Sequence, residues 1–150
     1  MFMTCIETIS DIIKIEAYGS KDIHLSIPFT HDRMIRSSVV TMLGTPVIIS
    51  LKEGTAEARC SLKVSEAGDQ FENSLTWQVD DNMPETLQQI SSLSAGRYHY
   101  VITTYSGLRK LIYNWCGVGR TLPDGSMSGN TETITMTFLI TGRHPILTLI

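Results

Sequence analysis

The chain has 150 residues, which suits one domain that buries roughly two thirds of the surface its unfolded form exposes. Its formal net charge is −3, only 18% of its residues are charged, and no basic cluster is longer than the pair Arg109-Lys110. Nucleic-acid-binding proteins neutralise phosphates with basic patches, so this composition argues against sequence-specific binding of DNA or RNA.

The cysteines and the N-terminal residues bear on the compartment. Cys5, Cys60 and Cys116 are odd in number and share no Cys-x-x-Cys spacing, so we expect reduced, buried thiols. The first residues lack the basic region and apolar core of a signal peptide, and no run approaches the ~18 apolar residues of a spanning helix. We therefore expect a protein made in the cytoplasm, without membrane insertion.

In the first half, polar turns separate strand-like stretches. Residues 11–17 and 23–29 flank a polar turn at 19–22, which predicts a hairpin. Residues 56–65 alternate, with Ala58 and Cys60 on one face and charged or hydroxyl side chains on the other. We expect residues 66–73 to turn the chain and residues 75–79 to form the next strand of a meander.

Residues 83–95 predict the one helix. Asp81-Asn82 supply a side-chain oxygen for the N-cap, and Pro84 suits the first turn. Leu87, Ile90 and Leu93 recur every three residues, and Gly96 follows as a C-terminal cap. Three turns with a single apolar stripe are expected to pack on a sheet.

A second hairpin is predicted over residues 98–105 and 108–115, around the two-residue turn Ser106-Gly107. That turn pairs Ile102 with Leu111, Tyr100 with Tyr113, and Tyr98 with Trp115, which makes one apolar ladder for the helix to cover. The opposite face would carry His99, Thr103, Lys110 and Asn114 and would meet solvent.

The last third predicts a loop, a strand and a tail. Residues 117–130 contain four glycines and no periodicity, which is typical of a binding loop or a disordered one. Residues 131–141 alternate between threonine and Ile134, Met136, Phe138 and Ile140, the pattern of a strand with one buried face. The apolar tail 146–150 is expected to lie against a sheet or a neighbouring subunit.

Together these elements predict a mainly β protein of the α+β class. We expect an antiparallel β-sandwich or a partly closed barrel of about seven or eight strands. One short helix, at about 83–95, would pack on it. The absence of an internal repeat or a linker favours a single domain over residues 1–150.

No catalytic or metal-binding signature is present in the sequence. The four histidines, His24, His31, His99 and His144, lack the spacing of zinc ligands, and the pair Asp80-Asp81 is better explained as helix caps. Nucleophile motifs such as Gly-x-Ser-x-Gly are absent. We therefore expect no enzyme activity, no cofactor and no metal.

The order of elements from about 75 to 145 resembles small tail, neck and baseplate proteins of tailed bacteriophages and prophages, particularly those of Bacteroides-type hosts. The resemblance rests on the strand 74–79, the helix, the hairpin Tyr-His-Tyr-Val-Ile-Thr-Thr-Tyr-Ser-Gly-Leu-Arg-Lys-Leu-Ile-Tyr-Asn-Trp, the glycine-rich loop and the threonine strand. Leu111-Ile112-Tyr113 departs from the Leu-Ile-Gly-like residues of such proteins. The resemblance implies a non-enzymatic virion protein that forms a ring or tube with copies of itself and with other phage tail or neck proteins.

For that role we expect subunit contacts at the hairpin tip, in the glycine-rich loop and in the tail. The candidate residues are Ser106, Gly107, Arg120, Leu122, Asp124, Met127, Asn130, Leu147 and Ile150. One alternative is a small binding module that holds a carbohydrate or an apolar ligand against Tyr98, Tyr100, Tyr113 and Trp115. Another is an enzyme with a dispersed site around His99 and Asp80.

Overall fold

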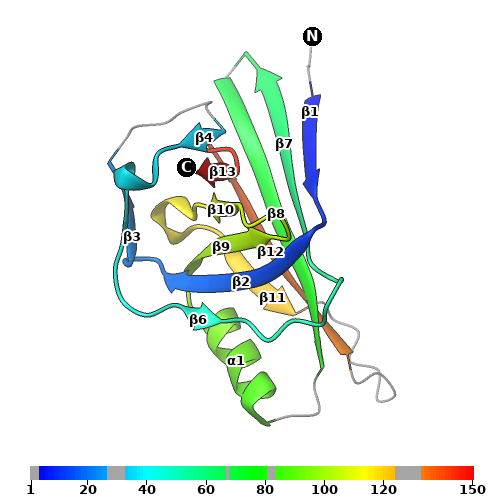
Figure 1. Cartoon of the computed structure of the whole chain (residues 1–150). Coiled ribbons are helices and arrows are strands. Elements are labelled where there is room, and N and C mark those ends of the chain that lie inside the picture. The colour runs from blue at the N-terminus through cyan, green and yellow to red at the C-terminus, as the bar shows by residue number, and fades with distance from the viewer. Residues whose placement is uncertain (1–3, 27–32, 67, 81–83, 124–132) are drawn as a thin grey trace.

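A computed structural model of the chain describes residues 4–26, 33–66, 68–80, 84–123 and 133–150. It is mainly β, with two open sheets that pack face to face and one α-helix beside them (Figure 1). The predicted fold class is confirmed, and of its two forms the sandwich is correct.

The first sheet has five antiparallel strands in the order β1-β7-β8-β12-β11. Their bounds are β1 Thr4–Ile9, β7 Glu57–Ser65, β8 Gly68–Asp80, β12 Thr133–Gly142 and β11 Arg120–Pro123. The expected turn at 66–73 is wrong, because β8 already begins at Gly68 and pairs with β7 through Ser65. The first residues of β8 are mostly polar and do not alternate between apolar and polar side chains, so no strand was expected there. Phe71 is the buried apolar residue among them.

The second sheet has six strands in the order β4-β13-β10-β9-β2-β6, antiparallel except for the β13–β4 pair. Their bounds are β4 Met34–Ile35, β13 Leu147–Leu149, β10 Arg109–Ile112, β9 Tyr98–Thr104, β2 Ile12–Gly19 and β6 Val47–Ile48. With the pair β3 (Ile23–Leu25) and β5 (Val40–Met42), the described residues hold thirteen strands instead of seven or eight. The excess consists of strands of two or three residues, which are too short to show alternation.

The predicted hairpin of residues 11–17 and 23–29 is wrong. Strand β2 pairs with β9 on one side and with β6 on the other, so neither of its edges is open to β3. After the turn, β3 pairs with β5 and lies over the face of the second sheet.

The main core lies between the two sheets. From the first sheet it receives Trp77, Met136 and Phe138, and from the second Ile15 and Tyr100. The alternation predicted for residues 56–65 and 131–141 is confirmed, since Ala58, Cys60, Ile134 and Ile140 are also buried here.

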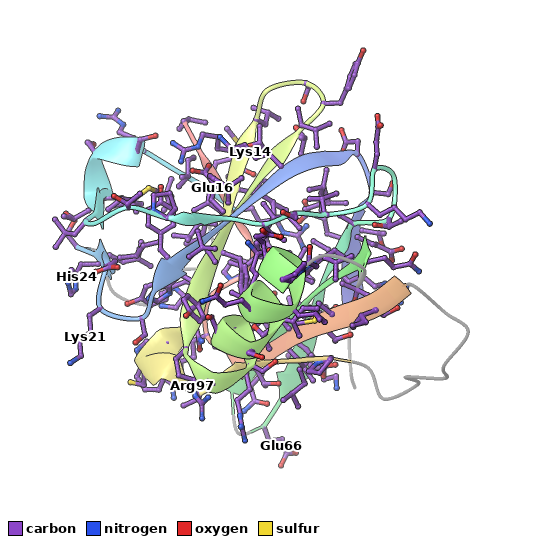
Figure 2. The ribbon with its side chains drawn as sticks, turned by 90° about the horizontal axis from the view of Figure 1, so that it is seen from below. Lys14, Glu16, Lys21, His24, Glu66 and Arg97 are labelled. Atoms are coloured by element: carbon purple, nitrogen blue, oxygen red, sulfur yellow. The ribbon has the colours of Figure 1, made fainter. Side chains whose placement is uncertain are left out.

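The second sheet also buries its other face, under β3, β5 and the 3-10 turn Ser37–Val39. In Figure 1, β7 and β8 lie on one side of the second sheet and β3 on the other. This second core contains Tyr18, Ile23, Ile35, Val101, Leu111, Leu147 and Leu149. At its margin Glu16 is buried, within 3.7 Å of Arg109 and 4.0 Å of Lys14 (Figure 2).

The hairpin of β9 and β10 is present, but its predicted register is wrong by one residue. Leu111 faces Val101, and Ile112 faces Tyr100, where Ile102 was expected opposite Leu111. A shift of one residue moves side chains to the opposite face of a strand. Tyr100, Ile102 and Ile112 therefore face the main core, whereas Val101 and Leu111 face the second core.

The turn explains the shift, because it has three residues, 105–107, instead of two. The Gly107 N–H donates to the Thr104 carbonyl, and the Thr104 N–H donates to the Leu108 carbonyl, both at 2.9 Å. Gly107 has φ +88°, the left-handed conformation that ends a three-residue hairpin turn.

Helix α1 (Pro84–Ala95) confirms the predicted helix and closes one flank of the sandwich. Leu93 is buried in the main core, and Ile90 packs against it. The helix lies against the edge strand β11. The side-chain amide of Gln89 donates to the Ile48 carbonyl and accepts from the Ser50 N–H, so it occupies the open edge of β6. The helix thus covers a flank and not the ladder that was predicted for the hairpin.

An ionic cluster closes the opposite flank. The carboxylate of Glu7, on the edge strand β1, lies 2.9 Å from Arg33 Nη1 and 3.4 Å from Lys110 Nζ. Lys110 belongs to the second sheet, and its side chain is only 14% exposed. The face of the hairpin that carries Lys110 was predicted to meet solvent. At Lys110 this face contacts the first sheet instead.

Candidate assembly surfaces

The tip of the β9–β10 hairpin, residues 105–108, is exposed. The side chain of Tyr105 is 84% exposed, and Leu108 is half exposed. The Tyr105 N–H donates to the carbonyl of Asp11 at 2.8 Å, so the exposed turn between β1 and β2 lies beside the tip. The tip therefore presents an aromatic ring, an aliphatic side chain and a nearby carboxylate.

The outer face of the first sheet is apolar at its β11 edge. Leu122 and Leu139 are 49% and 48% exposed. Leu122 faces Thr137, and Arg120 faces Leu139, so the two leucines are diagonal neighbours on one face. Val118, two residues before β11, is 59% exposed. We call Val118, Arg120, Leu122 and Leu139 the β11 margin.

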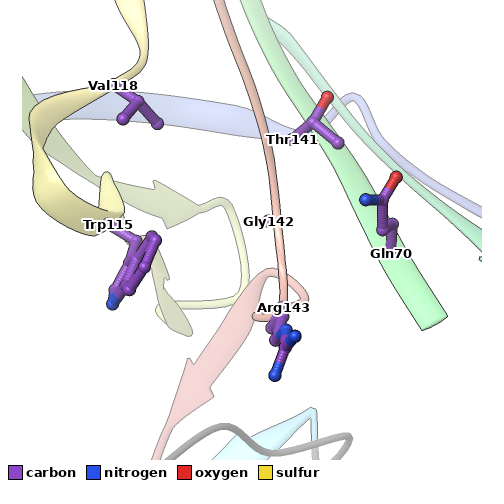
Figure 3. A pocket seen from close by; sticks show the side chains of 6 residues that line it. All are labelled: Gln70, Trp115, Val118, Thr141, Gly142 and Arg143. Carbon is purple, nitrogen blue, oxygen red and sulfur yellow. The ribbon is translucent and has the colours of Figure 1, made fainter. Parts of the chain in front are cut away.

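A groove of about 560 Å³ adjoins this margin (Figure 3). Trp115 and Val118 line one side, and Gln70 lines the other. The end of β12, with Thr141 to Arg143, runs between them. The indole of Trp115 is 44% exposed, so the groove offers an aromatic face to solvent beside a guanidinium group.

Asn114 holds the segment that carries Trp115. Its side-chain amide donates to the carbonyls of Tyr98 (3.0 Å) and Gly119 (2.9 Å), and its oxygen accepts from the Gly119 N–H at 2.8 Å. Between these points Cys116 takes a positive φ of 54°. These bonds fix the loop in which Trp115 and Val118 face outward.

Two residues before Trp115, Tyr113 lies between two histidines. Its ring stacks on His99 at 4.7 Å and meets the edge of His144 at 5.3 Å. The Asn114 N–H donates to His99 Nδ1 at 2.8 Å, so that nitrogen carries no proton, and Nε2 donates to the Ser20 carbonyl at 2.9 Å. Both histidines are structural, which contradicts the solvent-facing position predicted for His99.

Burial sets the pKa values of this cluster. Loss of hydration lowers the pKa of His99, and the nearby His24 lowers it further, while its bond to Ser20 acts in the opposite direction. Burial also lowers the pKa of His144. Burial raises the pKa of Tyr113. The neutral forms are therefore favoured in the folded chain.

The predicted contact residues fall into three groups. Ser106 and Gly107 at the hairpin tip, Arg120 and Leu122 on β11, and Ile150 at the chain end are exposed. Leu147 is fully buried in the second core, so its side chain is not available to another subunit. Asp124, Met127 and Asn130 lie outside the described residues.

Several surface residues were missed by the sequence reasoning. Trp115 was predicted to lie in the apolar ladder, and Gln70 and Arg143 were given no contact role, whereas Val118 lies in the glycine-rich loop in which subunit contacts were predicted. The Gly-Val-Gly sequence at 117–119 was the available signal, since an aliphatic residue between two glycines near an aromatic one belongs to a loop and not to a strand. Cys116 is exposed, contrary to the expected buried thiol, whereas Cys60 is buried as expected.

The described residues lack two general features. They contain no group of three or more His, Cys, Asp or Glu side chains that would hold a metal ion. Of the helices described, none is long and apolar enough to cross a membrane.

Comparison with known proteins gives no relative. No family model, no curated protein and no solved structure matches this chain.

Proposed function

We propose that this chain is a non-enzymatic structural protein of a tailed bacteriophage virion. It would assemble into a ring or tube with copies of itself and with other tail or neck proteins. Support comes from the resemblance of the second half and from the order β8, α1, β9–β10 hairpin and β12, which preserves the sequence of elements on which that resemblance rests.

The β11 margin is the observation that carries the proposal. Val118, Leu122 and Leu139 are about half exposed and contiguous, and the groove with Trp115 extends the same surface. Contiguous exposed apolar patches with polar surroundings mark protein interaction sites. Tryptophan and arginine, present here as Trp115 and Arg120, are the residue types that most often dominate the binding energy of such sites.

The rest of the first sheet's outer face suits a contact with protein. Thr137 faces Thr76 across β12 and β8, and Thr135 faces Gln78, so the strands next to the margin carry hydroxyl and amide side chains. Such groups make hydrogen bonds with a partner at a low desolvation cost compared with charges. Charged residues appear further out, on β7, where Arg59 lies 3.6 Å from Glu57.

Sedimentation velocity over a range of micromolar concentrations tests self-assembly. The wild-type chain should sediment as a multi-subunit species, and a Leu122→Glu, Leu139→Glu double variant should shift to the monomer, because its interface would contain unpaired charges. Leu87→Glu is the matched control, since Leu87 is exposed to a similar degree on α1. A margin variant that assembles like the wild type would remove the β11 margin from the proposal.

Membership of a virion needs a separate measurement. Mass spectrometry of density-purified particles from the host that encodes the chain should find it in stoichiometric amounts with other tail proteins. A chain that stays monomeric at every concentration and is absent from such particles would contradict the proposed function.

A second candidate function, the binding of a carbohydrate or apolar ligand, retains one observation in its favour, the groove beside Trp115. The four-ring platform is not formed: Tyr100 is fully buried, and Tyr113 lies between the two histidines. A titration with soluble saccharides tests this function, since binding at the groove would change Trp115 fluorescence. Trp77, being fully buried, would not respond.

A further inference from the structure

The groove and the hairpin tip lie at opposite ends of one structural unit. The tip joins β9 to β10 at residues 105–108, and Trp115 follows the far end of β10. Strand β9 has seven residues, which span roughly 23 Å at ~3.3 Å per residue. Because this hairpin is held in the middle of the second sheet, a chain cannot place its own tip in its own groove.

The tip has the form of a fixed protrusion. Three backbone bonds hold it: Gly107 to Thr104, Thr104 to Leu108, and Tyr105 to Asp11. A turn whose backbone is already ordered loses little backbone conformational entropy when a partner buries it. Tyr105 is the most exposed large hydrophobic residue of the described chain.

The groove has a complementary form. Its volume of about 560 Å³ exceeds that of a single phenol ring and leaves room for an adjacent aliphatic side chain such as Leu108. Trp115 provides a partly exposed aromatic face, and aromatic rings favour offset or edge-to-face contact. Gln70 and Thr141 supply hydrogen-bonding groups for a phenol hydroxyl.

The charges also match. Asp11 is exposed beside the tip, and Arg143 is exposed at the groove, with Arg120 on the adjoining margin. Arg143 already makes a contact within its own chain, and the five N–H donors of its guanidinium group allow a carboxylate of another copy to bind as well. Opposite charges at the border of two surfaces steer association and fix the orientation of the partners.

Given the proposed self-assembly, on which this step rests, we propose that the hairpin tip of one copy docks in the groove of the next copy. Tyr105 of one copy would stack on Trp115 of the next and pack against its Val118. Asp11 of the first copy would pair with Arg143 of the second. The contact is heterologous, because two different surfaces meet. Repetition of a heterologous contact gives a ring when the rotation closes, and two copies that exchange tips give a closed pair.

Two complementary variants test the contact by native mass spectrometry and sedimentation. Tyr105→Ala removes the protrusion, and Trp115→Ala removes the aromatic wall of the groove. Each variant alone should be monomeric at concentrations where the wild type assembles, with at least a tenfold higher dissociation constant. An equimolar mixture should form a two-chain complex and nothing larger, because one intact tip and one intact groove remain.

The charge pair of Asp11 and Arg143 provides an independent test of the contact. Asp11→Arg and Arg143→Asp should each weaken assembly, and the two changes in one chain should restore it. Gln88→Glu on α1 is a matched control for an added charge at an exposed position that belongs to neither surface. Circular dichroism of each variant confirms the fold. For any variant that does not fold, a photo-crosslinker placed at residue 105 of the otherwise wild-type chain should label the Trp115 segment of a different copy.

The outcomes separate this inference from the proposed function. A wild type that assembles while both alanine variants assemble equally well overturns the tip-in-groove contact and leaves the virion role standing. Monomeric variants whose mixture also stays monomeric overturn the contact too. A wild type that remains monomeric at every concentration overturns both self-assembly and the contact. A wild type that stops at two chains supports the contact in its reciprocal form when each alanine variant alone is monomeric, and overturns it when the variants form pairs as well.

Discussion

The two sheets of this molecule differ in the number of faces that they bury. The first sheet buries one face and leaves the other to solvent, so β12 reads as apolar residues alternating with threonines. The second sheet buries both faces, and β9 contains four consecutive buried residues, His99 to Ile102. Alternation is a property of a half-buried strand, and it disappears when both faces are covered.

That difference explains where a sequence-based reading of side-chain direction is dependable. Phe138 is placed correctly because its neighbours Thr137 and Leu139 lie on the open face. Leu111 was expected on the same face as Tyr100 but faces the second core. Its neighbour Ile112 is also buried, so only the turn could fix its direction, and the turn has three residues instead of two. The predictions below test how far each face contributes to stability.

The largest effect is expected in the main core. Phe138→Ala should lower the free energy of unfolding by about 3–5 kcal/mol, because it removes a fully buried ring that packs on Tyr100. Equilibrium denaturation in urea gives this value. The exposed neighbour Leu139 provides the control, since Leu139→Ala should change stability by less than about 1 kcal/mol.

Much of the fold was accessible from the sequence, but the surfaces were not. The helix, the threonine strand and the mainly β class follow from local signals that need no partner. The second core depends on β3, β5 and β13, which are three residues each. Strands β3 and β5 pair only with each other, and β13 pairs with β10 and β4, which are far away in the chain. The groove depends on the hydrogen bonds of Asn114, which hold the loop so that Trp115 faces outward. The pattern of apolar residues cannot predict this, because the direction of Trp115 is set by a buried side-chain amide.

The second core should also be essential to the fold. Leu147→Ala should cost about 2–5 kcal/mol, because Leu147 is fully buried beside Leu111 on the covered face of the second sheet. Thermal and urea denaturation measure the change. A cost below about 1 kcal/mol would mean that β3 and β5 cover the sheet only loosely, and the contrast between the sheets would then fail.

Substitution of two threonines compares the buried face of the first sheet with its open face. The hydroxyl of Thr121 is buried and hydrogen-bonded to the Tyr100 hydroxyl, whereas Thr137 lies on the open face of the first sheet. Thr121→Val should cost about 1–3 kcal/mol, because it leaves a buried phenol without that partner. Thr137→Val, which makes the same chemical change, should alter stability by less than about 0.5 kcal/mol. Equal effects at the two positions would contradict the assigned faces.

The pH dependence of stability tests the covered face of the second sheet in a different way. Burial lowers the pKa of His99 and of His144 below the usual histidine value of 6.5, so the unfolded chain binds protons at a higher pH than the folded chain does. By linkage, the stability contributed by the neutral histidines is complete above pH 6.5. It is lost as the pH falls from 6.5 through the lower pKa values of the folded state.

Urea midpoints measured between pH 8 and pH 5 should therefore decrease toward acid. His99→Gln should be less stable at neutral pH, because the Asn114 N–H and the Ser20 carbonyl lose their present partner, but its midpoint should fall less steeply with acid. Thr121→Val is the control, since it weakens a buried hydrogen bond without removing a histidine, and it should keep the wild-type slope. An unchanged slope in the His99 variant would show that its ring is open to protonation in the folded chain, and the second sheet would then not bury this face as tightly as its contacts require.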